Sequence, residues 1–269
     1  MAAEEPGSSL RSGRLFCTIG RMNPPTAGHM RVIERLFEQA SKVDGNVVIF
    51  ISESSGGDKG KENPLLCPNK KIVLEKMIAK MIARNPLFKD VPFEVNCGNP
   101  VLSIFGYVAR IRPAEVFIIL GNEPEKVEMG ESIRSGFFDA YVPKFKEGSD
   151  QDTIDAAIQL AREKTEKRRQ TYGGITLQLE FMDRPPGSIS ATMVRQYVTS
   201  ENKPQFKALY NGYLEDINQN RLFTNITEGL NRIKRNATSK VKSKRPSKTS
   251  KTNANNNRPK KRQTTKNSR

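Results

Sequence analysis

The stretch Gly20-Arg-Met-Asn-Pro-Pro-Thr-Ala-Gly-His29 joins a short apolar run, Leu15–Ile19, to a segment with helical periodicity. The apolar residues of that segment, spaced three or four apart, are Met30, Ile33, Phe37 and Ala40. A glycine after a strand lets the backbone turn tightly and lets a ligand approach it. Gly28 and His29, the only histidine of the chain, open the helix, where free N–H groups and the helix dipole favour an anion. The stretch therefore predicts a strand, an anion-binding loop and a helix in succession.

The rest of the chain repeats this alternation. Apolar runs typical of strands are Val47–Ile51, Phe93–Asn96, Val116–Leu120 and, more weakly, Ala140–Val142. Ile175–Met182 alternates polar and apolar residues, which predicts a strand nearer the edge of the sheet. Amphipathic patterns typical of helices cover 72–82, 101–111, 193–198, 206–214 and 222–233. This order predicts a single α/β domain with a doubly wound parallel, Rossmann-like sheet. Ligands bind beyond the carboxyl ends of such strands, so the candidate loops follow Ile19, Ile51, Leu120 and Met182.

The positive charge is concentrated at the C-terminal end. The formal charge is +16, but residues 232–269 hold 15 Lys and Arg and no Asp or Glu, whereas residues 1–231 hold 30 basic and 29 acidic residues. A segment with the composition of 235–269 cannot bury a core. We therefore expect a flexible N-terminus over 1–12, an α/β domain over 13–234 and a disordered basic tail over 235–269.

The remaining bulk properties favour an intracellular, cytoplasmic protein. Cys17, Cys67 and Cys97 lack the spacing of a zinc site, and their odd number fits a reducing compartment, with Cys17 in an apolar run typical of a buried thiol. The first 12 residues lack the apolar run of a signal peptide, and no stretch approaches the ~20 apolar residues of a membrane span. Arg258-Pro-Lys-Lys-Arg262 has the composition of a nuclear-import patch, as does any solvated charge run.

A second polar motif, Ile189-Ser-Ala-Thr-Met-Val-Arg195, follows the last predicted strand. Ser190 and Thr192 supply hydroxyls at a helix N-terminus, and Arg195 shares the helix face of Thr192. A guanidinium can hold two phosphate oxygens at once. A third polar segment, Gly121-Asn122-Glu123, ends the Val116–Leu120 strand. It is either a ligand contact or an ordinary polar turn.

The first motif, Gly-x-x-x-Pro-x-Thr-x-Gly-His, resembles the HxGH signature of the nucleotidylyltransferase superfamily. That superfamily includes nicotinamide mononucleotide and phosphopantetheine adenylyltransferases, FAD synthetases and cytidylyltransferases. The 189–195 motif resembles the family's ISSTxxR motif, and residues 121–123 resemble its Gly-x-Asp. Thr26 stands where the signature has its first histidine, as in the phosphopantetheine branch, and Glu123 stands where the family carries Asp. The resemblance covers about Leu15 to Leu214.

The resemblance implies an adenylyltransferase that moves AMP from ATP to a phosphate-bearing acceptor, with nicotinamide mononucleotide the favoured acceptor, and releases pyrophosphate. It implies that His29 and Thr26 act on the reacting phosphate, and Arg195, Ser190 and Thr192 on the leaving phosphates. The further nucleotide contacts that it implies are Gly20, Arg21, Met22, Asn23, Gly28, Gly121, Asn122, Glu123 and Ile189. Mg²⁺ travels with the triphosphate in this scheme and needs few protein ligands. Lys59 and Lys61 either close over the phosphates or are solvated loop charges.

A different class of function stays open from the sequence. The fold could be a catalytically degenerate nucleotide-binding protein whose basic tail binds nucleic acid. The tail has no aromatic residue on which a base could stack. Such binding would therefore be electrostatic and independent of base sequence.

Deleting Arg235–Arg269 should leave activity and melting temperature almost unchanged, because a segment without periodic apolar residues cannot offset the ~1–2 kcal/mol per residue that ordering its backbone costs. The same deletion should abolish salt-sensitive binding to DNA or RNA, as measured by titration at several salt concentrations. A truncated chain that keeps a steep salt dependence would place the contact on the folded domain instead.

Overall fold

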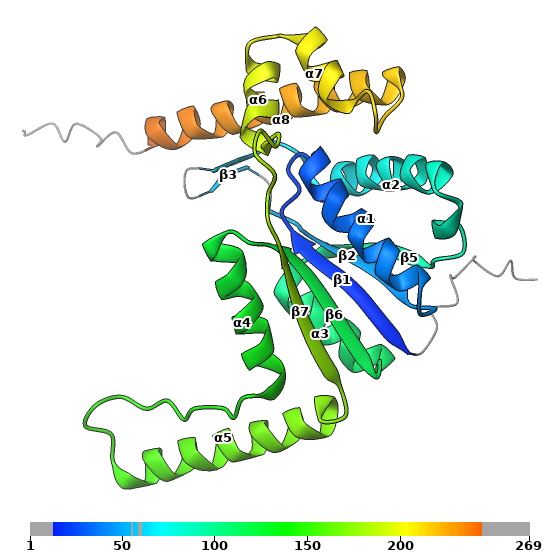
Figure 1. Ribbon diagram of the computed structural model, residues 1–269. Helices are drawn as coiled ribbons and strands as arrows, with labels where there is room; N and C mark the ends of the chain where they lie inside the picture. The colour runs from blue at the N-terminus through cyan, green and yellow to red at the C-terminus, as the bar shows by residue number, and fades with distance from the viewer. Residues whose placement is uncertain (1–12, 55, 59–60, 244–269) are drawn as a thin grey trace, which may run out of the picture.

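The computed structural model describes residues 13–54, 56–58 and 61–243 of the chain. Its centre is a five-stranded parallel sheet in the order β5-β2-β1-β6-β7 (Figure 1). The strands are β1 (Arg14–Gly20), β2 (Asn46–Ser52), β5 (Phe93–Gly98), β6 (Glu115–Gly121) and β7 (Thr176–Met182). Every neighbouring pair in this sheet is parallel, so the predicted doubly wound α/β fold is confirmed.

Helices cover both faces of the sheet, which explains why the central strands are continuously apolar. All seven residues of β2 are buried. Alternate residues of β1 serve opposite cores: Phe16 packs on the side of α1 (Ala27–Ser41) and α2 (Cys67–Arg84). Leu15 and Cys17 pack on the side of α3 (Pro100–Ile111) and α4 (Pro124–Phe138). A strand buried on two faces has no polar side, as parallel sheets require.

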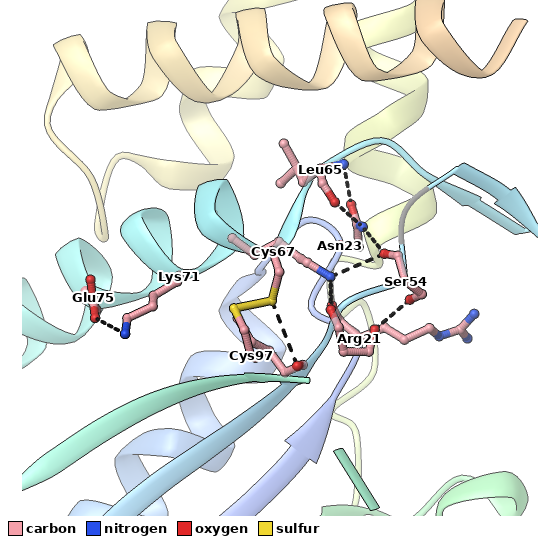
Figure 2. The surroundings of a disulfide bond; sticks show 11 residues. Arg21, Asn23, Ser54, Leu65, Cys67, Lys71, Glu75 and Cys97 are labelled. Carbon is pink, nitrogen blue, oxygen red and sulfur yellow. Dashed lines mark hydrogen bonds and ion pairs between the residues drawn. A yellow bond between two sulfur atoms is a disulfide. The ribbon is translucent and has the colours of Figure 1, made fainter. Parts of the chain in front are cut away.

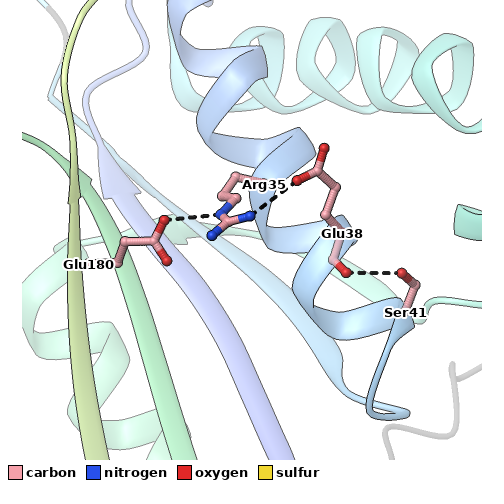
Figure 3. Close-up of polar contacts among 4 residues, drawn as sticks. All are labelled: Arg35, Glu38, Ser41 and Glu180. Carbon is pink, nitrogen blue, oxygen red and sulfur yellow. Dashed lines mark hydrogen bonds and ion pairs between the residues drawn. The ribbon is translucent and has the colours of Figure 1, made fainter.

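The strand order reverses between β1 and β6. From β1 the chain adds β2 and β5 in one direction, and it then returns to add β6 and β7 in the other. Loops that leave the two sides of such a switch point diverge, and the carboxyl ends of β1 and β6 therefore border a crevice. On the α1 side, Arg35 donates to Glu180 of edge strand β7 at 3.0 Å and ties that helix across the sheet (Figure 3).

The last part of the chain returns to the carboxyl end of the sheet. There α6 (Ala191–Thr199), α7 (Lys203–Tyr210) and α8 (Asp216–Ser243) gather beside a small hairpin of β3 (Gly56–Asp58) and β4 (Lys61–Asn63) (Figure 1). A Cβ on Gly229 would lie 2.0 Å from the Pro64 carbonyl oxygen, so α8 packs backbone to backbone there. Arg232 donates to the same oxygen at 2.9 Å.

The structure differs from the sequence-based expectation in several segments. One is the helix α4, because no pattern predicted a helix between Leu120 and Ala140. Ala140–Val142 forms no strand, because these residues are exposed between α4 and α5 (Gln151–Tyr172). The polar loop expected before Pro64 contains the β3–β4 hairpin. The helix α5 also has no counterpart in the prediction: it carries Ile154, Ala157, Ile158 and Ala161 at helical spacing, but of these only Ala161 is buried.

The basic segment begins inside a helix. The domain end predicted after Lys234 falls within α8, which continues to Ser243 because Lys, Ser, Thr and Asn can extend a helix without burying a core. Residues 1–12 and 244–269, which include most of the predicted tail, lie outside the described residues, as does Lys59. A deletion that starts after Ser243 is therefore a cleaner test of the tail than one that starts at Arg235.

The cysteines are not all free, contrary to the expectation from their odd number. Cys17 is a fully buried free thiol, as predicted. Cys67, the first residue of α2, forms a disulfide with Cys97 near the end of β5, with 6.1 Å between their Cα atoms (Figure 2). The 30-residue spacing gave no sign of this pair, because the fold brings the two ends together. In the described part of the chain, no helix is both long and apolar enough for a membrane span.

Replacing Tyr210 with Phe should lower the free energy of unfolding by about 1–3 kcal/mol, because a buried carbonyl loses its donor. The Tyr210 hydroxyl donates to the Pro25 carbonyl oxygen at 2.7 Å inside the protein. Urea denaturation measures the loss, with the same change at the half-buried Tyr213 as the matched control. Equal losses in the two variants would show that the bond to Pro25 contributes nothing specific.

Candidate functional site

A cleft of about 1080 Å³ opens at the switch point, beyond the carboxyl ends of β1 and β6 and between the first turns of α1 and α6. It gathers nearly all the residues that the sequence singled out. The predicted residues that line it are Gly20, Arg21, Met22, Asn23, Thr26, Gly28, His29, Gly121, Glu123, Ser190, Thr192 and Arg195. Two predicted residues do not line it: Asn122 is exposed and bonds to Asp183, and Ile189 packs against the core. The cleft thus brings together three motifs that are distant in sequence.

The loop from Gly20 to Thr26 forms the floor of the cleft, and other elements hold it. Met22 adopts a left-handed backbone with φ 44°, and the Asn23–Pro24 bond is cis. The amide of Asn23 makes two hydrogen bonds of 3.0 Å with the backbone of Leu65, one as donor and one as acceptor (Figure 2). Asn23 is buried, so this pair fixes the loop against the start of α2.

His29 stands in the first turn of α1 with its ring held by Thr26. Nδ1 lies 3.0 Å from the Thr26 backbone nitrogen, which donates to it, and 2.9 Å from the Thr26 hydroxyl oxygen. Since Nδ1 accepts, a neutral ring carries its hydrogen on Nε2. Burial, with smaller contributions from Lys126 and Arg184, lowers the pKa of His29 to about 4. At neutral pH the ring is therefore an uncharged donor.

Arg195 connects the second motif to the first. Nη1 donates to the carbonyl oxygen of Asn23 at 2.8 Å, and Nη2 donates to the Thr192 hydroxyl at 3.0 Å. Ser190 caps the same helix, accepting from the backbone nitrogen of Met193 at 3.1 Å. The start of α6 is thus fixed over the β1–α1 loop, with its first-turn N–H groups at the cleft.

The sequence analysis missed three cations that line the cleft, which are Arg31, Lys126 and Arg184. Lys126, in the first turn of α4, donates to the Ile19 carbonyl oxygen at 3.2 Å, and burial lowers its pKa. Arg184 pairs with Glu123 at 3.0 Å. None of the three belongs to a motif, and a lone lysine or arginine in a polar segment is typical of a solvated surface. They make the cleft receptive to an anion.

Glu123 folds back over the end of β6. A Cβ on Gly121 would lie 2.1 Å from Oε2 of Glu123, so the glycine makes room for this carboxylate. Because Glu123 is paired with Arg184, it presents less negative charge to the cleft than its position in the sequence suggests. Within the described ranges, no three His, Cys, Asp or Glu side chains are grouped as a metal site.

The fold and the cleft define an α/β protein with an anion-receptive site at the switch point of a parallel sheet. No family model matches the chain, and no curated protein matches its sequence. Among solved structures, Thermotoga maritima TmcAL bound with alpha-thio ATP has a TM-score of 0.41 and 15% identity, covering 82% of this chain and 56% of that one. Enterococcus italicus Csm6 bound to cyclic hexa-2'-fluoro-hexa-dAMP has a TM-score of 0.27 and 12% identity, covering 84% and 56%. The chain spans just over half the length of each, and likenesses of this size carry no argument about function.

The ring of His29 should stay neutral well below pH 6.5 in the folded chain. Because the folded pKa is lowered, the unfolded chain gains a proton first, so stability falls as the pH drops from 6.5 toward 4 and does not change through this group above pH 7. Between about pH 7 and pH 5, the parent chain should lose about 1–2 kcal/mol more of its free energy of unfolding than the His29→Asn variant loses. NMR titration measures the pKa of His29, the single histidine, directly. A midpoint near the ordinary value would contradict the partly buried, Thr26-bound ring.

Proposed function

We propose that the chain is a nucleotidyltransferase of the HxGH type that transfers AMP from ATP to a phosphate-bearing acceptor. The observation that carries the proposal is the hydrogen bond from Arg195 to the Asn23 carbonyl oxygen. It joins, at one cleft, the two motifs that resemble the family and stand 172 residues apart in the chain. The cleft, of about 1080 Å³, slightly exceeds the range of ~300–1,000 Å³ for ligand sites, which suits a nucleotide beside a second small molecule.

In this proposal the phosphates lie between the N-termini of α1 and α6, where backbone N–H groups point at them. His29 donates from Nε2 to an oxygen of the reacting phosphate. Thr26 acts through His29 as a positioning residue, since its N–H and hydroxyl meet Nδ1. This differs from the direct phosphate contact that the resemblance implied for Thr26.

The chemistry needs placement and charge more than a reactive side chain. An acceptor phosphate oxygen attacks the α-phosphorus in line, the bond to the β-phosphate oxygen breaks, and pyrophosphate carries the electron pair away. Lys126, Arg184 and Arg195 are among the cations of the cleft that can neutralise the growing charge. We expect no covalent intermediate with the protein.

Mg²⁺ would enter with the triphosphate, and the cleft carboxylates do not form a complete site for it. Glu123 is paired with Arg184, and Asp183 accepts from Asn122 at 2.8 Å. Glu125 is the third cleft carboxylate. An ion that keeps most of its coordination from phosphate oxygens and water fits this donor set, and it would offset charge on the phosphates.

ATP with nicotinamide mononucleotide is the first substrate pair to try, followed by phosphopantetheine as acceptor and CTP as donor. Product chromatography must show the joined nucleotide, because pyrophosphate alone also forms by hydrolysis. A chain that binds ATP tightly but turns over no acceptor would be the nucleotide-binding protein whose basic tail binds nucleic acid.

Replacing His29 with Ala should lower turnover at least ~100-fold, about 3 kcal/mol of lost transition-state stabilisation, while the fold is kept. Steady-state pyrophosphate release with the accepted substrate pair measures this, and circular dichroism checks the fold. Glu34→Ala, exposed on the same helix and outside the cleft, is the matched control and should keep parental turnover. Near-parental turnover in folded His29→Ala would exclude the proposed role of the ring.

A further inference from the structure

A buried lysine lies beneath the cleft and has no place in the mechanism above. Lys70, in the first turn of α2, has 0% of its surface exposed. Among the side chains that the structure describes, no carboxylate forms an ion pair with Lys70, and the carboxylate that acts on its charge is that of Glu53. Burial lowers the pKa of Lys70 to about 8, with Glu53 acting weakly in the opposite direction. A charge that is costly to bury needs compensation from nearby dipoles.

The compensation comes from three backbone carbonyls. The Lys70 ammonium donates to the carbonyl oxygens of Arg21 and Ser54, each at 3.4 Å, and of Ser52 at a shorter distance. An ammonium has three N–H donors, so its capacity is filled. These oxygens come from the ends of β1 and β2 and the loops that follow them. The negative ends of the three carbonyl dipoles therefore point toward one place. Without a cation between them they would repel one another.

The same carbonyls border the proposed site. Arg21 lines the cleft, and Asn23, two residues later, accepts from Arg195 through its own carbonyl oxygen. The Asn23 amide also lies 3.5 Å from the Ser54 oxygen, which it shares with Lys70 (Figure 2). The loops after β1 and β2 are therefore joined through the start of α2, below the phosphates.

We propose that Lys70 is a positioning residue whose ammonium acts as a built-in monovalent cation, holding the loops after β1 and β2 in the shape that the nucleotide site requires. The inference rests on the proposed function for its link to catalysis. The role of Lys70 in ordering the two loops does not depend on that function. The proposed function and the role of Lys70 can therefore fail separately.

The first test compares Lys70→Met, which keeps the apolar stem and removes the charge, with Lys71→Met. Lys71 is the neighbouring half-exposed lysine, 3.8 Å from Glu75, and is the matched control (Figure 2). Without nucleotide, amide hydrogen exchange over residues 20–26 and 52–54 should be at least about tenfold faster in Lys70→Met and unchanged in α4. The dissociation constant for ATP should rise at least about tenfold. Lys71→Met should match the parent in both measurements.

The second test is chemical rescue. Lys70→Ala should regain loop protection and ATP affinity when propylammonium is added, in a saturable way. Tetramethylammonium, which carries charge but cannot donate a hydrogen bond, should have no such effect. A lysine that merely filled space would not show this selectivity.

Parental exchange and ATP affinity in folded Lys70→Met would overturn the proposal, and so would equal rescue of Lys70→Ala by both cations. If Lys70→Met does not fold, the rescue of Lys70→Ala decides. Folding of Lys70→Ala that is restored by propylammonium but not by tetramethylammonium supports the proposal, and folding that neither cation restores overturns it. If the parent binds no ATP, the proposed function fails, and hydrogen exchange alone then decides the role of Lys70.

Discussion

A buried backbone carbonyl must find a donor, and the loop between β1 and α1 is a buried loop. This constraint ties together parts of the chain that share nothing else. The carbonyls of Arg21, Asn23 and Pro25 accept, in turn, from Lys70 of α2, Arg195 of α6 and Tyr210 of α7. The return of the chain to the carboxyl end of the sheet after β7 is therefore part of what shapes the loop.

The sheet could be predicted from the sequence because strands buried on two faces leave an unbroken apolar run. That signal is strong for β1, β2 and β6, and it fails where burial is slight. The β3–β4 hairpin has no apolar pattern of its own, and the helix α5 buries only Ala161. Both depend on capping, turns and neighbours, such as the Asp150 carboxylate that accepts from Thr153 at 2.8 Å.

The cleft could be predicted as far as its motifs reach. Short motifs identify groups at strand ends and helix starts, and these lie together once the strand order is known. Lys70, Lys126 and Tyr210 carry no such local signal, because their importance comes from the loop carbonyls that they meet. The pairing of Cys67 with Cys97 was missed for the same reason. Tertiary contacts, which no local sequence pattern reveals, determine the roles of these three residues and the pairing of the two cysteines.

The strand order has a consequence for the chain while it is being synthesised. Among the described residues, β1 is the first strand in chain order and the middle strand of the sheet, and its partner β6 follows about a hundred residues later, as the 101-residue separation of Arg14 and Glu115 shows. At roughly 5–20 residues per second, one edge of an apolar strand waits about 5–20 s for its neighbour. An unpaired apolar edge is an aggregation hazard. The nascent chain therefore passes through a vulnerable period that the finished sheet conceals, and occupancy by a chaperone would be expected in that interval.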